Sequence, residues 1–186
     1  MTNDTALVLL DYINEIVHPT GKLAAKGYAN FIQTQGVYDS LQKTIDTAHS
    51  EGDLIIAVGL AFDPTYVDQP IGSPIFGKAA EFGILQNDTW STDYTDAIKL
   101  PGETVHLTKN RVSAFTATVL DQLLRNRGVR TVRLAGVASD LAVEATARAA
   151  HDLDYIIEIA AGSSAAASTE DHERALTSMS KFATIL

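Results

Sequence analysis

The stretch "LAGVASDLAVEATARAAH", residues 134–151, begins as an apolar strand and turns abruptly into a helix. Its second half places Val143, Ala147 and Ala150 on one helical face. In an open α/β sheet, ligands bind beyond the carboxyl ends of the strands, where such turns lie. We therefore expect a functional site at this turn, although Ala142 occupies the position at which a nucleophile is expected.

Five further apolar runs accompany this strand along the chain. They are short and continuous, which is typical of strands buried on both faces of a parallel sheet. The six runs cover residues 6–11, 53–62, 104–108, 131–137, 155–160 and 181–186. Helical periodicity recurs between them, and Ser168 is the expected N-cap of the last helix. The alternation predicts an α/β fold in one domain, residues 1–186, whose six-stranded, mostly parallel sheet carries helices on both faces.

The segment from Asp63 to Leu100 does not fit this alternation. It has little periodicity, it contains Pro64, Pro70 and Pro74, and it carries several aromatic residues. A long loop inside a compact domain is often a functional lid. The alternative is one or two helical turns packed on the core, and the sequence leaves both open.

The composition narrows the classes of function. The 186 residues carry a net charge of −9 without a basic run, so we expect neither nucleic acid nor a membrane as a partner. The chain has no cysteine, which excludes a thiol nucleophile. Its first residues lack a signal-peptide pattern, and no apolar run approaches the roughly 20 residues of a membrane span. These features predict a cytoplasmic protein.

Two charged residues are expected near the turn. Asp11 ends the first apolar run, and Lys109 lies just past the run 104–108. In a parallel sheet both lie at the same edge as the turn that carries Ala142. In such a site the carboxylate could act as a general base and the ammonium could stabilise negative charge. The N-terminus of the helix would also favour a bound anion. The alternatives are that Asp11 only stabilises a turn or caps a helix, and that the Lys109 side chain is only solvated.

Three stretches resemble the isochorismatase-like hydrolases, also called cysteine hydrolases. They are "ALVLLDYINE" (6–15), "KNRVSAFTATVLDQLLRNRGVRTVRLAGVASDLAVEATARAAHDLDY" (109–155) and "SSAAASTEDHERAL" (163–176). The resemblance implies a Rossmann-like three-layer α/β sandwich, for which we expect the strand order 3-2-1-4-5-6. It also implies a catalytic triad of Asp, Lys and Cys. Asp11 and Lys109 match that triad, and Ala142 occupies the Cys position.

The resemblance also implies further features of the site. Backbone N–H groups of Ala138 and Ala142 would form an oxyanion hole, and the Val137–Ala138 peptide bond would be cis. Members of the family commonly form dimers or tetramers, so a homo-oligomer is expected. The Asp-x-His metal motif of the family's nicotinamidases is absent, since "GLAFDPTYVDQP" (59–70) has Asp63 but no histidine. We therefore expect no metal and no cofactor.

Aromatic residues are the candidates for the apolar walls of a small-molecule pocket, with ordinary core packing as the alternative for each. They are Tyr12, Phe62, Trp90 and Phe115. Arg111 and Lys78 are the nearby cations that could bind a carboxylate.

Because Ala142 occupies the position of the family's cysteine, three hypotheses about the function remain. The first is a hydrolase of a small carbonyl or enol-ether compound that works through Asp11 and Lys109 without a thiol, as the resemblance implies for some isochorismatases. The second is a Cys-dependent amidase seen as a Cys→Ala variant at position 142. The third is a catalytically inactive small-molecule binding protein of the same fold. We rank the first highest. Ser139, next to the turn, is not expected to replace the thiol.

Overall fold

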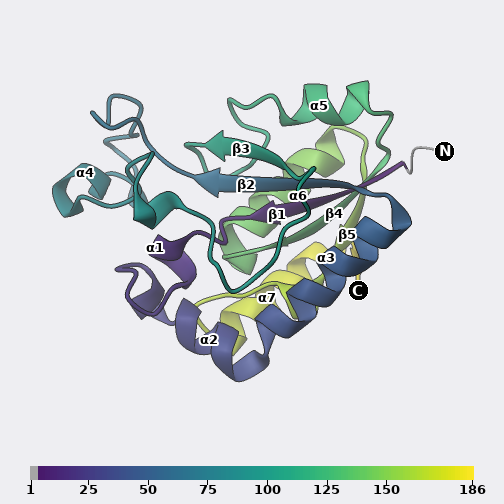
Figure 1. Ribbon diagram of the computed structural model, residues 1–186, viewed down its shortest axis with the longest axis horizontal. Coiled ribbons are helices and arrows are strands. Elements are labelled where there is room, and N and C mark those ends of the chain that lie inside the picture. Colours follow the sequence, from purple (N-terminus) through teal and green to yellow (C-terminus); the bar gives the residue numbers. More distant parts are fainter. Residues whose placement is uncertain (1–3) are drawn as a thin grey trace.

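A computed structural model describes residues 4–186, whose strands form one parallel sheet in the order β3-β2-β1-β4-β5-β6 (Figure 1). This confirms the predicted strand order. The strands are β1 (Thr5–Leu10), β2 (Leu54–Leu60), β3 (Val105–Lys109), β4 (Thr131–Gly136), β5 (Ile156–Ile159) and β6 (Thr184–Ile185). The central strand β1 pairs with β2 and β4, and Leu9 faces Ala57 on one side and Ala135 on the other.

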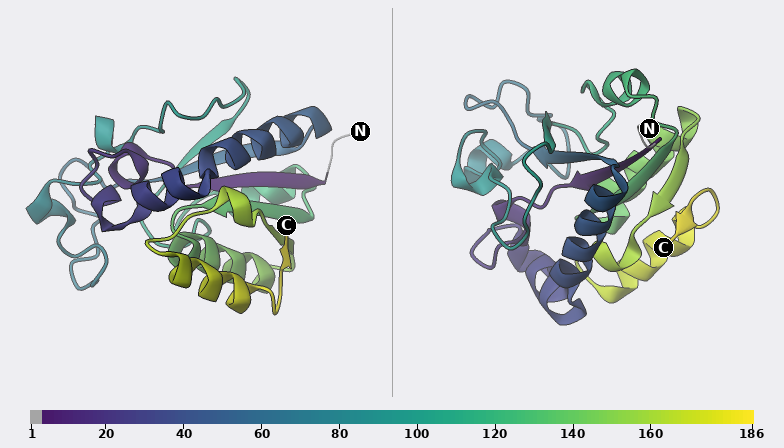
Figure 2. Two further views of the ribbon diagram at one scale, coloured as in Figure 1. Left: turned by 90° about the horizontal axis from the view of Figure 1, so that it is seen from below. Right: turned by 45° about the vertical axis from the view of Figure 1, so that its right-hand side comes forward.

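Helices cover both faces of the sheet, so the molecule has three layers (Figure 2). The helices are α1 (Asn14–Val17), α2 (Tyr28–Gln35), α3 (Val37–Glu51), α4 (Ala79–Phe82), α5 (Leu120–Asn126), α6 (Glu144–Asp152) and α7 (Thr169–Met179). Leu7 and Leu9 pack with α1–α3, whereas Val8 and Leu10 pack with α5–α7. The alternation of side chains along β1 therefore supplies both cores, which explains its continuous apolar sequence.

Two details differ from the sequence-based expectations. Helix α2 was not predicted, because it buries only Phe31 and Ile32 and so shows little periodicity. The last apolar run forms a strand only at Thr184–Ile185, because Phe182 still closes the turn that ends α7 by donating its N–H to the carbonyl of Met179. The predicted cap is confirmed, since the Ser168 side chain accepts a hydrogen bond from the Asp171 N–H.

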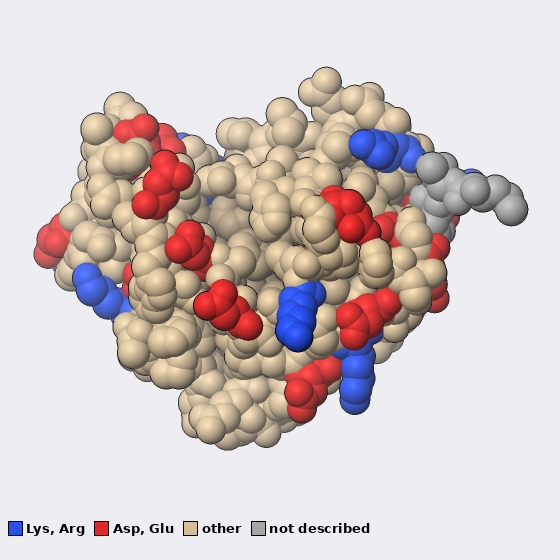
Figure 3. Space-filling view, viewed as in Figure 1, with Lys and Arg blue, Asp and Glu red and all other residues tan. Residues whose placement is uncertain are grey.

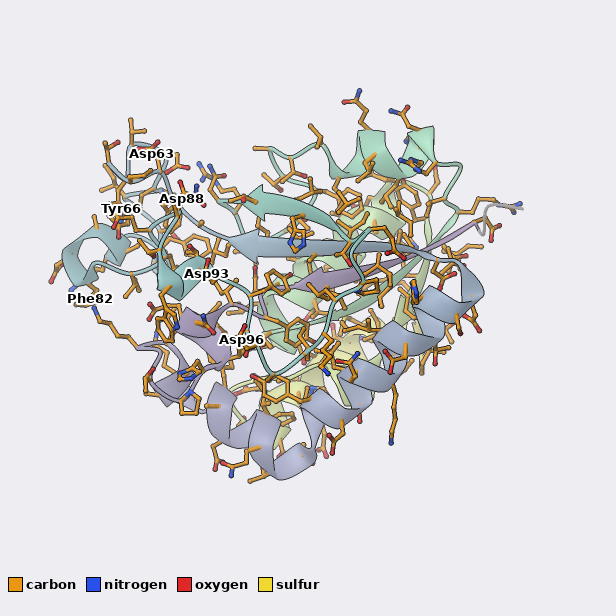
Figure 4. The ribbon with its side chains drawn as sticks, viewed as in Figure 1. Asp63, Tyr66, Phe82, Asp88, Asp93 and Asp96 are labelled. Carbon is orange, nitrogen blue, oxygen red and sulfur yellow. The ribbon has the colours of Figure 1, made fainter. Side chains whose placement is uncertain are left out.

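The segment between β2 and β3 projects beyond the carboxyl ends of the strands (Figures 1 and 4). It contains only short helical turns, α4 and the 3₁₀ turn η2 (Trp90–Thr92). It also buries side chains in the core that includes α1–α3, namely Phe76, Ala79, Ile84, Leu85 and Ile98. The segment is therefore packed on the core as one alternative predicted, and it also borders the cavity described below.

Acidic side chains predominate on the face shown in Figure 3, as expected from the net charge of −9. Within residues 4–186, no helix combines the length and apolar character needed to cross a bilayer.

Candidate active site

A cavity of about 260 Å³ lies where the carboxyl ends of β1, β2, β3 and β4 meet. It is lined by Asp11, Ile16, Leu23, Lys26, Tyr28, Leu60, Pro74, Ile75, Phe76, Ala79, Ile84, Leu85, Lys109, Val112, Val137, Ala138, Leu141 and Ala142. The structure thus brings Asp11, Lys109 and Ala142 to one cavity. Its volume lies just below the roughly 300–1,000 Å³ typical of drug-sized ligands, so the site suits a small compound.

Asp11 and Lys109 form a buried ion pair at this cavity. The Lys109 Nζ lies 2.7 Å from Asp11 Oδ2 and also donates to the Arg111 carbonyl at 3.2 Å. Each of the two paired residues is only 2% exposed. The other carboxylate oxygen, Asp11 Oδ1, is buried without a hydrogen-bond partner in the described part of the chain. Asp11 lines the cavity, and this buried carboxylate oxygen is free to carry a proton.

Burial raises the pKa of Asp11 above its usual value, because removal from water disfavours the charged carboxylate, while Lys109 and the backbone N–H of Leu60 oppose the shift. The net direction is upward. A carboxyl group with a raised pKa can hold a proton closer to neutral pH, which general acid catalysis requires.

The turn after β4 keeps the backbone geometry that the resemblance implied. The Val137–Ala138 bond is cis, and residues Ser139–Val143 form one π-type turn, η3, in which Val143 N–H donates to the Ala138 carbonyl. The Ala138 N–H makes no hydrogen bond to another group of residues 4–186. Ala138 and Ala142 both line the cavity.

Gly136 allows this turn to approach β1 closely. A Cβ atom at position 136 would lie 2.6 Å from the Cβ of Leu10 and 2.9 Å from its carbonyl oxygen. Only glycine fits there without displacing the strand that carries Asp11.

Ser139 turns away from the cavity. Its side chain is fully buried, and its Oγ lies 2.7 Å from Nδ1 of His172 on α7. Burial lowers the pKa of His172, so the ring favours its neutral form. Neither residue lines the cavity, in agreement with the expectation that Ser139 does not replace the thiol. Sequence reasoning missed this contact, because 33 residues separate the two partners.

The four aromatic residues proposed as cavity walls do not line this cavity. The Tyr12 hydroxyl donates to the Ser163 carbonyl, and Phe62 packs on Phe76 at 5.5 Å between ring centroids. The Trp90 ring makes an edge-to-face contact with the His18 ring, and the Phe115 ring stacks on that of Tyr155. Each of the four side chains contacts a partner other than the cavity itself, because nearness to a strand end in the sequence does not set the direction of a side chain.

Residues from α1, η1 (Ala24–Lys26), α2 and the β2–β3 segment form the walls instead. The polar wall residues Lys26 and Tyr28 were also missed. The side chains of the two cations expected near the site, Arg111 and Lys78, do not line the cavity. Arg111 Nη1 donates to the carbonyls of Asp68 and Asn110, and Lys78 Nζ lies 5.9 Å from the centre of the Phe82 ring.

Asp63 lies on the projecting segment (Figure 4). It accepts hydrogen bonds from the N–H and hydroxyl of Thr65. Within residues 4–186, no cluster of three or more His, Asp or Glu side chains is arranged to hold a metal ion.

Comparison with known proteins agrees with this architecture. A family model described as "Isochorismatase domain" matches residues 5–186. The ureidoacrylate amidohydrolase RutB of Acinetobacter baylyi is 29% identical over 163 residues, which cover 81% of this chain and 66% of that relative. The match therefore spans slightly less than two thirds of the relative's length.

Solved structures share the fold over nearly the whole chain. An isochorismatase family protein from Desulfovibrio vulgaris superposes with a TM-score of 0.87 at 22% identity, covering 99% of this chain and 94% of that one. The N-carbamoylsarcosine amidase of Thermoplasma acidophilum gives 0.77 at 26% identity, covering 100% and 95%. A pyrazinamidase/nicotinamidase from Streptococcus mutans gives 0.79 at 27% identity, covering 98% and 99%.

Proposed function

The chain belongs to the isochorismatase domain family, and we propose that it is a hydrolase of a small carbonyl or enol-ether compound that works through Asp11 and Lys109 without a thiol. The observation that carries this proposal is the buried Asp11–Lys109 pair, whose second carboxylate oxygen has no partner within residues 4–186. This pair supports proton transfer from Asp11 to a bound ligand, because Asp11 lines the cavity and the pKa of its carboxyl group is raised.

For an enol ether, the proton of Asp11 passes to the terminal alkene carbon, and the resulting cation is stabilised by the ether oxygen. Water adds to this cation and returns a proton to the Asp11 carboxylate. The hemiketal then breaks its carbon–oxygen bond to give a carbonyl compound and an alcohol. Lys109 stabilises the carboxylate formed in the first step. The Ala138 N–H is a candidate donor to the substrate oxygen.

A Cys-dependent amidase seen as a Cys→Ala variant is the second candidate. Two similar proteins, the amidohydrolase of Acinetobacter baylyi and the amidase of Thermoplasma acidophilum, are named for amide cleavage. Ala142 lines the cavity at the matching turn, so a thiol there would face the same ligand. An inactive binding protein is the third candidate.

The test assays the chain, Asp11→Asn and Ala142→Cys on simple vinyl ethers, 2-alkoxyacrylates and primary amides. We expect the unaltered chain to hydrolyse enol ethers. Asp11→Asn should lower kcat/KM at least about 100-fold, which is the lower range for losing a general acid. The rate should fall as pH rises through the raised pKa of Asp11, because the proton-donating form is then lost. Asp63→Asn, outside the cavity, is the matched control.

Amide cleavage by Ala142→Cys alone would replace this proposal with the amidase. Inactivity of both the unaltered chain and Ala142→Cys would favour the binding protein.

A further inference from the structure

The charged residues that line the cavity differ in whether they have a partner within the described part of the chain. Asp11 and Lys109 are paired with each other, whereas Lys26, which is exposed to solvent, forms no ion pair or side-chain hydrogen bond within residues 4–186. The neighbouring Tyr28 hydroxyl likewise has no hydrogen-bond partner in this part of the chain. The walls therefore offer one uncompensated cation and one free hydroxyl, and no uncompensated carboxylate belongs to the lining.

The backbone that carries these two residues is held in place before Lys26 and again between Lys26 and Tyr28. Before it, the buried Glu15 carboxylate accepts hydrogen bonds from the N–H groups of Lys22 at 2.8 Å and Leu23 at 3.3 Å. Between the two residues, Gly27 has a φ of 116° and lies so close to Ala167 that a Cβ atom would be 2.1 Å from its carbonyl oxygen. Lys26 and Tyr28 are thus presented from a fixed backbone, which lowers the entropic cost of binding a ligand.

Two acidic residues lie near Tyr28 without lining the cavity. Burial raises the pKa of Tyr28, and Asp140 and Asp171 add to the shift, so its hydroxyl keeps the proton that it can donate. Asp171 is paired with Arg174 and also accepts from the Ser168 hydroxyl. Asp171 is thus paired on α7, whereas Asp140 forms no ion pair within residues 4–186 and its Oδ1 is buried without a hydrogen-bond partner there.

The remaining walls are apolar, with Leu23, Ile75 and Phe76 among them, and the space is small. We propose that the cavity selects a small monocarboxylate with an apolar body, whose carboxylate is bound by Lys26 and Tyr28 while its other end faces Asp11. This rests on the proposed function only in that the ligand occupies the same cavity. Lys26 would then determine substrate specificity rather than take part in the chemistry.

The test measures binding, which does not require turnover. Benzoate and benzamide have nearly the same shape and differ in charge, so each is titrated calorimetrically into the chain. We expect benzoate to bind about tenfold more tightly, as one charge-assisted hydrogen bond allows. Lys26→Met should abolish the difference, and Tyr28→Phe should reduce it. The matched control is Lys78→Met, an exposed cation outside the cavity, which should keep the preference.

The inference is overturned if benzoate binds no more tightly than benzamide, if neither binds at millimolar concentration, or if Lys26→Met keeps the preference. A loss in Lys78→Met equal to that in Lys26→Met would also overturn it, since the preference would then reflect the general field of the protein. Selective benzoate binding without hydrolysis of any compound in the assay would contradict the proposed function alone. Hydrolysis of neutral substrates only, without benzoate selectivity, would contradict this inference alone.

Discussion

Asp11 takes up a left-handed backbone conformation, with a φ of 60°, directly after β1. This conformation is uncommon for a residue with a side chain, and here it accompanies the 2.7 Å contact with Lys109. Both charges are removed from water, and their attraction offsets that cost only while both partners are present. The pair is therefore a feature in which a single substitution has a large effect.

Asp11→Asn should lower the free energy of unfolding by about 3–5 kcal/mol, because it leaves the Lys109 ammonium buried without a counter-charge. Urea denaturation followed by circular dichroism measures the change. The double variant Asp11→Asn/Lys109→Met should recover part of the loss, since it removes the orphaned charge. A loss below about 1 kcal/mol for the single variant would show that water or a rearranged carbonyl already satisfies Lys109.

At the scale of elements, the site depends on short turns more than on long helices. The turn η3 places Ala138 and Ala142 at the cavity, and η1 with the start of α2 places Lys26 and Tyr28 there. Such turns have little intrinsic stability, so their shape depends on close backbone contacts. Gly27, which joins η1 to α2, is the clearest of these contacts.

Gly27→Ala should destabilise the protein by about 2 kcal/mol more than Gly36→Ala. Both glycines have positive φ, so both substitutions carry the left-handed penalty of about 1–2 kcal/mol. Only at Gly27 would the new Cβ also collide with a backbone oxygen, whereas a Cβ atom at Gly36 would have no neighbour within 4 Å. Thermal unfolding of the two variants measures the difference, and equal losses would refute the close contact.

At the scale of the whole molecule, the projecting segment between β2 and β3 exposes large apolar side chains. Val67 is 82% and Ile71 is 86% exposed, and Ile75 and Phe82 are more than half exposed. Phe82 lies at the outer end of this segment (Figure 4). Apolar groups gathered on one projecting segment commonly mark a contact surface between proteins.

We expect the chain to form a homo-oligomer through this segment. Light scattering at micromolar concentration should give a dimer or tetramer of the 19.9 kDa chain. Ile71→Asp should lower that mass, because it places a charge in the contact. Val119→Asp, an exposed apolar position in another part of the chain, should leave it unchanged. A monomeric mass for the unaltered chain would refute this expectation.

The alternation of strands and helices, and the placement of Asp11, Lys109 and the turn of Ala142 at one sheet edge, could be predicted from the amino-acid pattern, whereas the strand order was implied by the resemblance to the isochorismatase-like hydrolases. Apolar runs and helical periodicity are local signals, and parallel strands bring their carboxyl ends to one edge of the sheet. Residues that follow directly after strands are therefore placed by the topology alone. The abrupt change from strand to helix after β4 was also visible in the sequence, whereas the cis Val137–Ala138 bond was implied by the resemblance and the close approach of Gly136 to Leu10 was found only in the structure.

The walls of the cavity could not be predicted in this way. Lys26 and Tyr28 reach it because Gly27 packs on Ala167, and Phe62 is kept from it by its contact with Phe76. In each case the direction of a side chain depends on a partner that is remote in the sequence. Periodicity carries no information about such partners, so the ligand-facing surface is a product of tertiary packing.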